Sequence, residues 1–240
     1  MINCISPFFL VLLAFTFVHP ASGVIRDGGI DPANLGKGEW IYSVKDATNR
    51  LGGHIDSVTN EASLFQYYKS IGVKYVIIKM GTSAAYYEGC YATPHQVTAT
   101  LCDIARTNGV WVFGYTRSYG EDIAGEVALV DSVFNNGADG FVFDAEAEWE
   151  SNQPWIGTNG PALAWELGQM VRAKWPTKFI AHAPFPVLYL HSSFPYKEFG
   201  YWCDTIMPQV YHISRTGLKG SPSAVMNWMD VNYRTWQNSL

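Results

Sequence analysis

The sequence of 240 residues has no cluster of basic side chains. Its 16 lysines and arginines are outnumbered by 21 aspartates and glutamates, which gives a formal net charge of -5. A mildly acidic chain without a basic patch is a poor candidate for binding nucleic acid or an anionic membrane surface. We therefore expect neither of these as a partner.

Long apolar runs are absent beyond the N-terminus. The apolar run over residues 7–18 is shorter than the roughly 20 residues of a membrane-spanning helix. It is followed by Pro20 and by small residues at 21–23, an order typical of a signal peptide, although no basic residue precedes the run. We expect a signal peptide over 1–23 and one secreted or extracytoplasmic domain over 24–240, monomeric and free of the membrane after cleavage. An uncleaved N-terminal anchor is the alternative.

Cysteine is scarce as well. Cys4 falls within the expected signal peptide, which leaves the odd number of Cys90, Cys102 and Cys203. Cys90 and Cys102 are the pair closest in sequence, but three buried thiols fit the spacing equally well. There is no Cys-x-x-Cys pair and no array of His and Cys, so the sequence indicates no structural zinc site.

Short β-rich runs alternate with longer helical patterns from residue 38 onward. Strands are predicted at Trp40–Val44, Tyr75–Met80, Val110–Tyr115, Gly140–Asp144, Phe179–Ala183 and Thr205–Tyr211. Helices are predicted near 57–71, 94–108, 122–136, 160–175, 195–202 and 222–237. Helix starts are indicated at Thr93-Pro94 and Ser221-Pro222, and left-handed helix ends at Gly72, Gly109 and Gly137.

This alternation predicts βαβ units and a parallel sheet. The predicted fold class is α/β, a parallel (β/α) barrel of the TIM type. An open doubly wound sheet is the alternative, but no glycine-rich phosphate loop follows the first strand. Six βα units are visible where a complete barrel has eight. Either the domain over 24–240 is truncated at its C-terminus, as a fragment of a longer gene product, or further strands escape the pattern. An incomplete barrel would have unclosed strand edges.

The acidic strand end Asp144, Glu146 and Glu148 is the sharpest feature of the sequence. Side chains alternate along a strand, so these carboxylates share one face while Phe141 and Phe143 take the other. The phenylalanines can pack on helices, which points the acids toward the barrel axis. Clustered carboxylates are costly because like charges repel. We therefore interpret Asp144 and Glu146 as functional, and Glu148 as either functional or part of a solvated loop.

Two carboxyl groups suit the cleavage of a glycosidic bond, in which one acid protonates the leaving oxygen and a second carboxylate acts as nucleophile, base or orienting group. Asp144 and Glu146 are two residues apart, roughly 6–7 Å along a strand. That separation falls between the retaining and inverting arrangements, so the stereochemistry stays open. Glu146 as the acid needs a raised pKa, which the charge of Asp144 favours and a nearby Lys79 or Arg117 would oppose.

Polar side chains at other strand ends are candidates for holding a substrate. Gln209 and Tyr211 share a face of the last predicted strand and can bind sugar hydroxyl or acetamido groups. A buried tyrosine with an ordinary hydrogen bond is the bland alternative. The third group closes other strands and either contacts substrate or neutralises the acids: Lys79, Tyr115, Arg117 and His182.

Phe143-Asp144-Ala145-Glu146 resembles the Asp-x-Glu of lysozyme-type glycoside hydrolases (family 25) and the end of the acidic signature of chitinase-type hydrolases (family 18). The run Met207–Tyr211 is similar to sixth-strand Met/Gln/Tyr patterns in such barrels. The resemblance implies a (β/α) barrel, a glycan substrate, Glu146 as proton donor and Asp144 as its partner. The chain lacks the further aspartates of the chitinase signature, and it has Tyr42-Ser43-Val44 where lysozyme-type members carry an aspartate.

Three functional hypotheses follow. The first is a secreted glycoside hydrolase that needs no cofactor or metal. The second is a catalytically silent barrel that binds glycans through the same site. The third is a metal-dependent hydrolase in which the three acids and His182 hold a divalent cation. We rank the third lowest, because no His-x-His pair or second acidic strand accompanies these residues.

Overall fold

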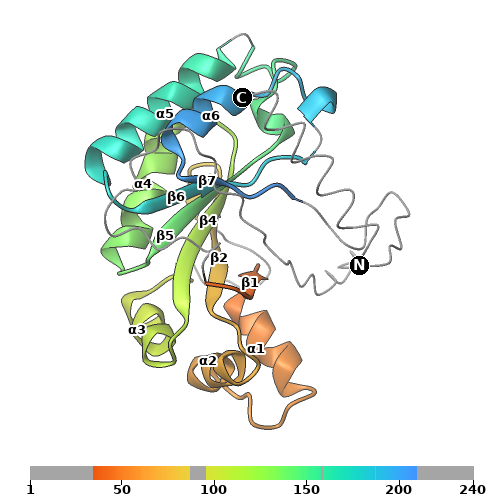
Figure 1. Ribbon diagram of the computed structural model, residues 1–240, viewed down its shortest axis with the longest axis vertical. Helices are drawn as coiled ribbons and strands as arrows, with labels where there is room; N and C mark the ends of the chain where they lie inside the picture. The colour runs from red at the N-terminus through yellow and green to blue at the C-terminus, as the bar shows by residue number, and fades with distance from the viewer. Residues whose placement is uncertain (1–34, 87–95, 158, 187, 210–240) are drawn as a thin grey trace.

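The computed structural model describes residues 35–86, 96–157, 159–186 and 188–209 (Figure 1). The strands are β1 (Gly38–Ile41), β2 (Tyr75–Thr82), β3 (Ala85–Tyr86), β4 (Trp111–Ser118), β5 (Gly140–Ala145), β6 (Phe179–His182) and β7 (Thr205–Ile206). The helices are α1 (Val44–Gly52), α2 (Glu61–Ser70), α3 (Ala99–Thr107), α4 (Ile123–Asn135), α5 (Gly160–Lys174) and α6 (Tyr196–Trp202). Two single 3₁₀ turns are η2 (Ala147–Trp149) and η3 (Leu188–Leu190). None of the helices within these ranges has the length and apolar character needed to cross a bilayer.

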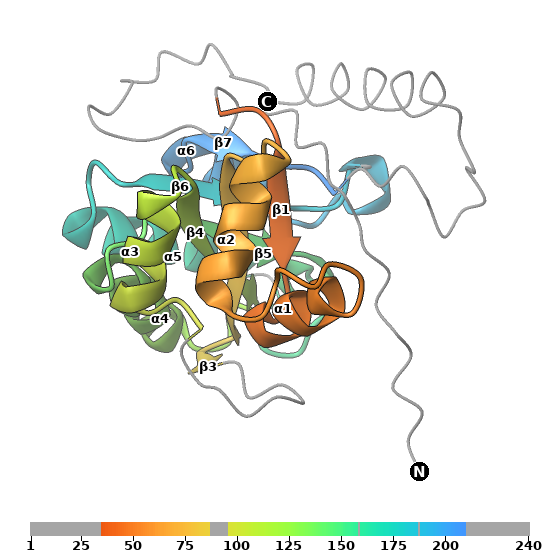
Figure 2. The ribbon, with the colours of Figure 1, turned by 90° about the horizontal axis from the view of Figure 1, so that it is seen from below.

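The sheet has the order β1-β2-β4-β5-β6-β7, and every neighbouring pair in that order is parallel. Only β3 departs from it, as an antiparallel addition to β2. The sheet curls, and the helices lie on its outer side (Figures 1 and 2). Among the described residues β1 and β7 each pair on one side only, so the predicted incomplete α/β barrel is confirmed.

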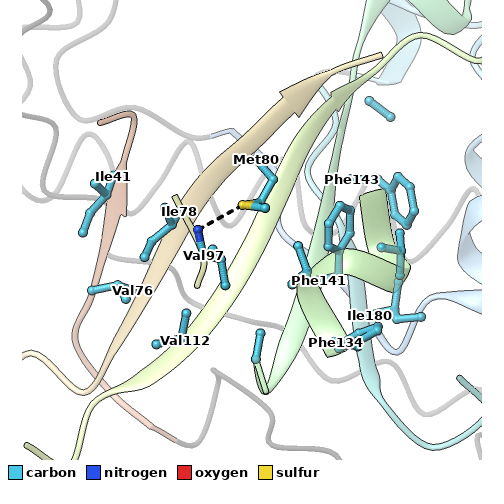
Figure 3. Close-up of a cluster of buried hydrophobic side chains, with 14 of the residues drawn as sticks. Ile41, Val76, Ile78, Met80, Val97, Val112, Phe134, Phe141, Phe143 and Ile180 are labelled. Atoms are coloured by element: carbon cyan, nitrogen blue, oxygen red, sulfur yellow. Dashed lines mark hydrogen bonds between the residues drawn. The ribbon is translucent and has the colours of Figure 1, made fainter. Parts of the chain in front are cut away.

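Alternation along the strands separates two cores. Val76, Val112 and Phe141 are among the buried side chains that face the helices, as Figure 3 shows for this layer. A smaller cluster on the opposite, inner face includes Phe113 and Val142. Because β5 presents Phe141 and Phe143 to the helices, the side chains between and after them must face inward.

The glycine helix ends are confirmed. Gly72, Gly109 and Gly137 follow α2, α3 and α4 with φ of +80°, +71° and +88°. This left-handed conformation costs glycine little and turns the chain from each helix into the next strand. The helix starts predicted at Thr93-Pro94 and Ser221-Pro222 lie outside the described residues, as does the predicted helix over 222–237. Helix α3 is instead capped by Thr98, whose side chain accepts from Leu101 N at 3.1 Å.

Two predicted strands were wrong in part. The first ends at Ile41 rather than Val44, because the Ser43 side chain accepts from Asp46 N and starts α1, a helix the sequence patterns did not indicate. The last pairs only over Thr205–Ile206. Beyond β7, Met207 N and Gln209 N still donate to the His182 and Pro184 carbonyls, at 2.8 and 3.1 Å, while Pro208 between them has no N–H to donate. Residues 210 and 211 of the predicted strand lie outside the described residues. Cys102 carries a buried free thiol, and Cys90 lies outside the described residues.

Candidate active site

The predicted polar strand ends meet on the inner face of the sheet. Parallel pairing sets Arg117 of β4 beside Asp144 of β5, and Lys79 of β2 beside Tyr115 of β4. The carboxyl ends of parallel strands lie at one edge of the sheet, which is where barrels of this kind carry their sites. The register therefore brings together side chains that are far apart in the sequence.

Asp144 and Glu146 form a contacting acid pair. The Nε2 group of Gln209 donates to Asp144 Oδ1 at 2.8 Å, to Glu146 Oε1 at 2.9 Å and to the Ala183 carbonyl at 2.9 Å. With a proton on one of them, the two carboxyl groups are placed to hydrogen-bond each other. An amide group has two N–H bonds for these three acceptors, so one N–H bond is shared between two acceptor oxygens. Gln209 thus crosslinks the acid pair to the end of β6.

Arg117 holds the other side of the acids. Its Nη2 lies 3.1 Å from Glu146 Oε2 and 2.6 Å from Glu148 Oε1, and its Nε donates to the same Glu148 oxygen at 3.0 Å. Glu148 is therefore folded back into the site, although β5 ends at Ala145 and Glu148 lies in the turn η2. The second oxygen, Glu148 Oε2, is buried and has no hydrogen-bond partner among the described residues.

The electrostatics of the pair favour a proton on Asp144. Burial raises the pKa of Asp144 well above its ordinary value, and the negative charge of Glu146 adds to this rise, while Arg117 and Lys79 oppose it. The Arg117 contact stabilises negative charge on Glu146. The sequence hypothesis placed the proton on Glu146. The raised pKa of Asp144 and the Arg117 contact to Glu146 favour the opposite assignment, with the proton of the pair on Asp144.

Lys79 lies on the inner face with aromatic rings around it. Its Nζ is 4.7 Å from the ring centroid of Tyr42 and 5.9 Å from that of Tyr115, and the Tyr115 ring packs edge-on against Trp40 at 4.8 Å. Burial lowers the pKa of Lys79, and the charge of Asp144 counteracts that effect. Lys79 and Arg117 together offset the charges of Glu146 and Glu148, so a protonated Asp144 leaves the site close to neutral.

His182 lies apart from this group. Ala181 and Ala183 belong to the inner cluster, so the side chain between them points to the helices, where its ring stacks on Phe199 with centroids 5.1 Å apart. It is completely buried, and burial lowers its pKa to about 3. The structure therefore does not bring His182 to the acids. Tyr211 lies outside the described residues.

Sequence reasoning missed the residues that support the acids from behind. Ser118, Glu126 and Trp149 form a buried hydrogen-bonded set under the acidic turn. No sequence spacing signals this set, because it joins a strand end, a helix and a loop. Tyr42, which covers Lys79, had a usable signal, since it follows the first strand as the other candidates follow theirs.

A contacting acid pair beside an arginine can exchange a proton with a bound molecule while the charge nearby stays balanced. Asp144 can hold the proton, Glu146 can pass it on, and Glu148 Oε2 can accept a hydrogen bond from a hydroxyl group. Within residues 35–86, 96–157, 159–186 and 188–209, no three His, Cys, Asp or Glu side chains are grouped so as to hold a metal ion.

Comparison with protein-family models finds no match, and comparison with curated proteins finds none either. Among solved structures, a GH18 chitinase from Pseudoalteromonas aurantia is similar at 18% identity and TM-score 0.47, covering 68% of this chain and 70% of that one. The chitinase domain of the spore coat protein CotE from Clostridium difficile gives 12% identity and TM-score 0.46, covering 68% of this chain and 57% of the domain. The structure of TcOYE with pHBA is similar at 11% identity and TM-score 0.43, covering 72% of this chain and 71% of that one. At these values the similarities assign neither activity nor substrate.

Proposed function

We propose that this chain is an exported glycoside hydrolase that cleaves an uncharged poly- or oligosaccharide by carboxyl acid catalysis. One observation carries the proposal: Asp144 and Glu146 share the amide donor of Gln209 at the carboxyl end of the parallel sheet, and Arg117 pairs with Glu146. Export rests on the apolar run followed by small residues at the N-terminus. A neutral glycan fits a site whose charges cancel when Asp144 is protonated.

The pair also limits the mechanism. In enzymes whose two carboxyl groups flank the scissile bond, these groups are about 5 Å or more apart. Asp144 and Glu146 share one amide donor and touch each other, so a sugar ring does not fit between them. Glu146 then acts alone as the acid, and Asp144 supplies its proton and orients the attacking group.

The step balances as a hydrolysis. Glu146 delivers the proton to the glycosidic oxygen as the bond from that oxygen to the anomeric carbon breaks. Water adds to the anomeric carbon and returns a proton to the pair. Between these two proton transfers, Arg117 stabilises the carboxylate that forms on Glu146. Glu148 Oε2, buried and without a partner in the described part of the chain, is placed to accept from a sugar hydroxyl.

The test is Glu146→Gln, which keeps the side-chain shape and removes the transferable proton. Positioned acid–base catalysis contributes about 10²–10⁴ in rate, so turnover should fall by that factor while oligosaccharide binding stays close to wild type. Release of reducing ends from a panel of neutral and N-acetylated oligosaccharides is measured beside a binding titration. Glu166→Gln on the exposed side of α5 is the matched control.

Equal turnover in wild type and Glu146→Gln would remove Glu146 from the mechanism. Binding without turnover in the wild type would reject hydrolysis and favour a silent glycan-binding barrel. Loss of wild-type turnover in a chelator, restored by adding a divalent cation, would favour the metal-dependent alternative.

A further inference from the structure

The turn η2 carries Glu148 and follows directly after Glu146, yet it is too short to hold its own shape. It contains one turn of 3₁₀ helix, in which Trp149 N donates to the Glu146 carbonyl at 3.0 Å. Isolated turns of this kind are weak, because one or two hydrogen bonds must offset the ordering of several residues. The position of both glutamates therefore depends on contacts outside the turn.

Trp149 supplies these contacts. Its side chain is completely buried, and its ring packs edge-on against Phe199 with centroids 5.0 Å apart. Gly120, at φ +70°, closes over the ring so tightly that an added Cβ would lie 2.8 Å from the indole. The indole Nε1 donates to the carbonyl and to the hydroxyl of Ser118, both at 3.0 Å.

Glu126 completes a directional chain of hydrogen bonds. The Ser118 hydroxyl donates to Glu126 Oε2 at 2.5 Å, which leaves its lone pairs for the indole. The other Glu126 oxygen accepts from the backbone N–H groups of Tyr119 and Gly120, at 2.8 and 3.0 Å. Glu126 is fully buried, and burial raises its pKa while the Ser118 hydroxyl and the two backbone N–H groups lower it. These three donors are therefore the contacts that favour its charged form.

Ser118, the middle residue of this hydrogen-bonded series, follows Arg117 in the sequence, and Trp149 follows Glu148. The side chains of Arg117 and Glu148 form the closest ion pair of the site. We infer that Glu126, Ser118 and Trp149, here called the Trp149 anchor, are positioning residues that set the distance between Arg117 and the two glutamates. The inference rests on the proposed function for its catalytic consequence, but the geometry that it predicts is independent of turnover. None of the three anchor residues touches the reacting atoms.

The first test is the titration of the Asp144–Glu146 pair by carbon NMR on protein labelled in the Asp and Glu carboxyl groups. Trp149→Phe keeps a large ring and removes the indole donor, and Ser118→Ala removes the hydroxyl. Arg117 and Lys79 lower the pKa of Asp144, and Glu146 raises it. If the anchor loosens, Arg117 moves away from the pair, so the apparent pKa of the pair should rise by an amount that changes its protonation equilibrium about tenfold.

Trp165→Phe is the matched control, because Trp165 is exposed on α5 and carries the same substitution. The control should titrate like the wild type, and a cooperative unfolding transition in each variant shows that it is folded. An unchanged titration of the pair in folded Trp149→Phe and Ser118→Ala would overturn the inference. So would an equal change in Trp165→Phe.

The second test is turnover. A misplacement of catalytic groups by about 1 Å can cost roughly 10²-fold, so kcat should fall about 10- to 100-fold in Trp149→Phe while KM changes by less than about twofold. If the wild type shows no turnover, the proposed function fails, and the titration still decides whether the anchor exists. If the wild type turns over and both anchor variants keep its kcat and its titration, the anchor is rejected and the function stands.

Discussion

Glu126, fully buried, and Asp144, partly buried, are two acids at the same end of the sheet, and burial raises the pKa of both. Glu126 accepts from one hydroxyl and two backbone N–H groups, all of them on the short segment 118–120. Asp144 accepts from one amide that it shares with Glu146, and it faces another carboxyl group. The three donors around Glu126 are fixed by the backbone and by one hydroxyl, which suits a structural acid. Asp144 has a second acid, Glu146, as its neighbour, which suits an acid that holds a proton and releases it.

The largest expected effect separates these two acids by activity. Asp144→Asn removes the proton that Asp144 supplies to Glu146, so we expect turnover to fall about 10²–10⁴-fold. Stability should stay close to wild type, because the amide, like the protonated carboxyl group, is uncharged and offers both a donor to Glu146 and an acceptor to Gln209. Turnover on an oligosaccharide and a urea unfolding curve are measured on the same sample. Full activity with lost stability would reverse the roles assigned to the two acids.

A third buried acid, Glu39 on β1, sharpens the comparison through pH. Burial raises its pKa from 4.5 to about 7, with Lys37 opposing the rise. A pKa raised in the folded state means that the folded chain holds its proton more tightly than the unfolded chain. The contribution of protonated Glu39 to the stability of the fold is therefore complete below about pH 4.5, and it is lost as the pH rises to about 7.

Glu39→Gln should remove this dependence. The free energy of unfolding of the variant minus that of the wild type should grow by about 3 kcal/mol between acidic and neutral pH, and other titrating groups cancel in the difference. Urea unfolding at several pH values measures it, with Glu61→Gln on the exposed start of α2 as a control. A difference that does not vary with pH would mean that Glu39 ionises in the fold as freely as in the unfolded chain.

The sequence was sufficient for the parallel strands, though not for all of their bounds or for β3, and for only part of the site. Apolar runs such as Val76–Ile78 predict a buried strand without a competing interpretation. The phenylalanines of β5 face the helices, and they thereby determine that Asp144 points to the inner face. The same alternation around Ala181 and Ala183 would have directed His182 to the helices. Strand parity was therefore a stronger guide than closeness to a strand end.

Long-range contacts account for what sequence reasoning could not reach. Gln209 contacts Asp144 across 65 positions of sequence, and this contact depends on how far the sheet curls. Glu148 lies beyond the end of β5, where alternation no longer applies, and it reaches the site because Trp149 anchors the turn. Helix α1 was missed because Val44 extends a β-rich run, while the cap that starts the helix is the single hydroxyl of Ser43.

The smallest expected effect concerns Glu126 itself. Glu126→Gln keeps an oxygen for the two backbone N–H groups but turns the other acceptor into a donor facing the Ser118 hydroxyl. That hydroxyl then meets two donors, the new amide and the Trp149 indole, and its own hydrogen loses a buried acceptor. An unsatisfied hydrogen bond of this kind costs about 1–2 kcal/mol, because relief of the buried charge offsets part of the loss. Urea unfolding of Glu126→Gln beside Asp144→Asn should therefore show a loss of stability for the first variant and none for the second.

Adding Ser118→Ala to Glu126→Gln should recover part of that lost stability, since the conflicting hydroxyl is gone. A double variant that is less stable than Glu126→Gln by the full effect of Ser118→Ala alone would show that the two side chains act independently, and the directional chain from Trp149 to Glu126 would then be rejected.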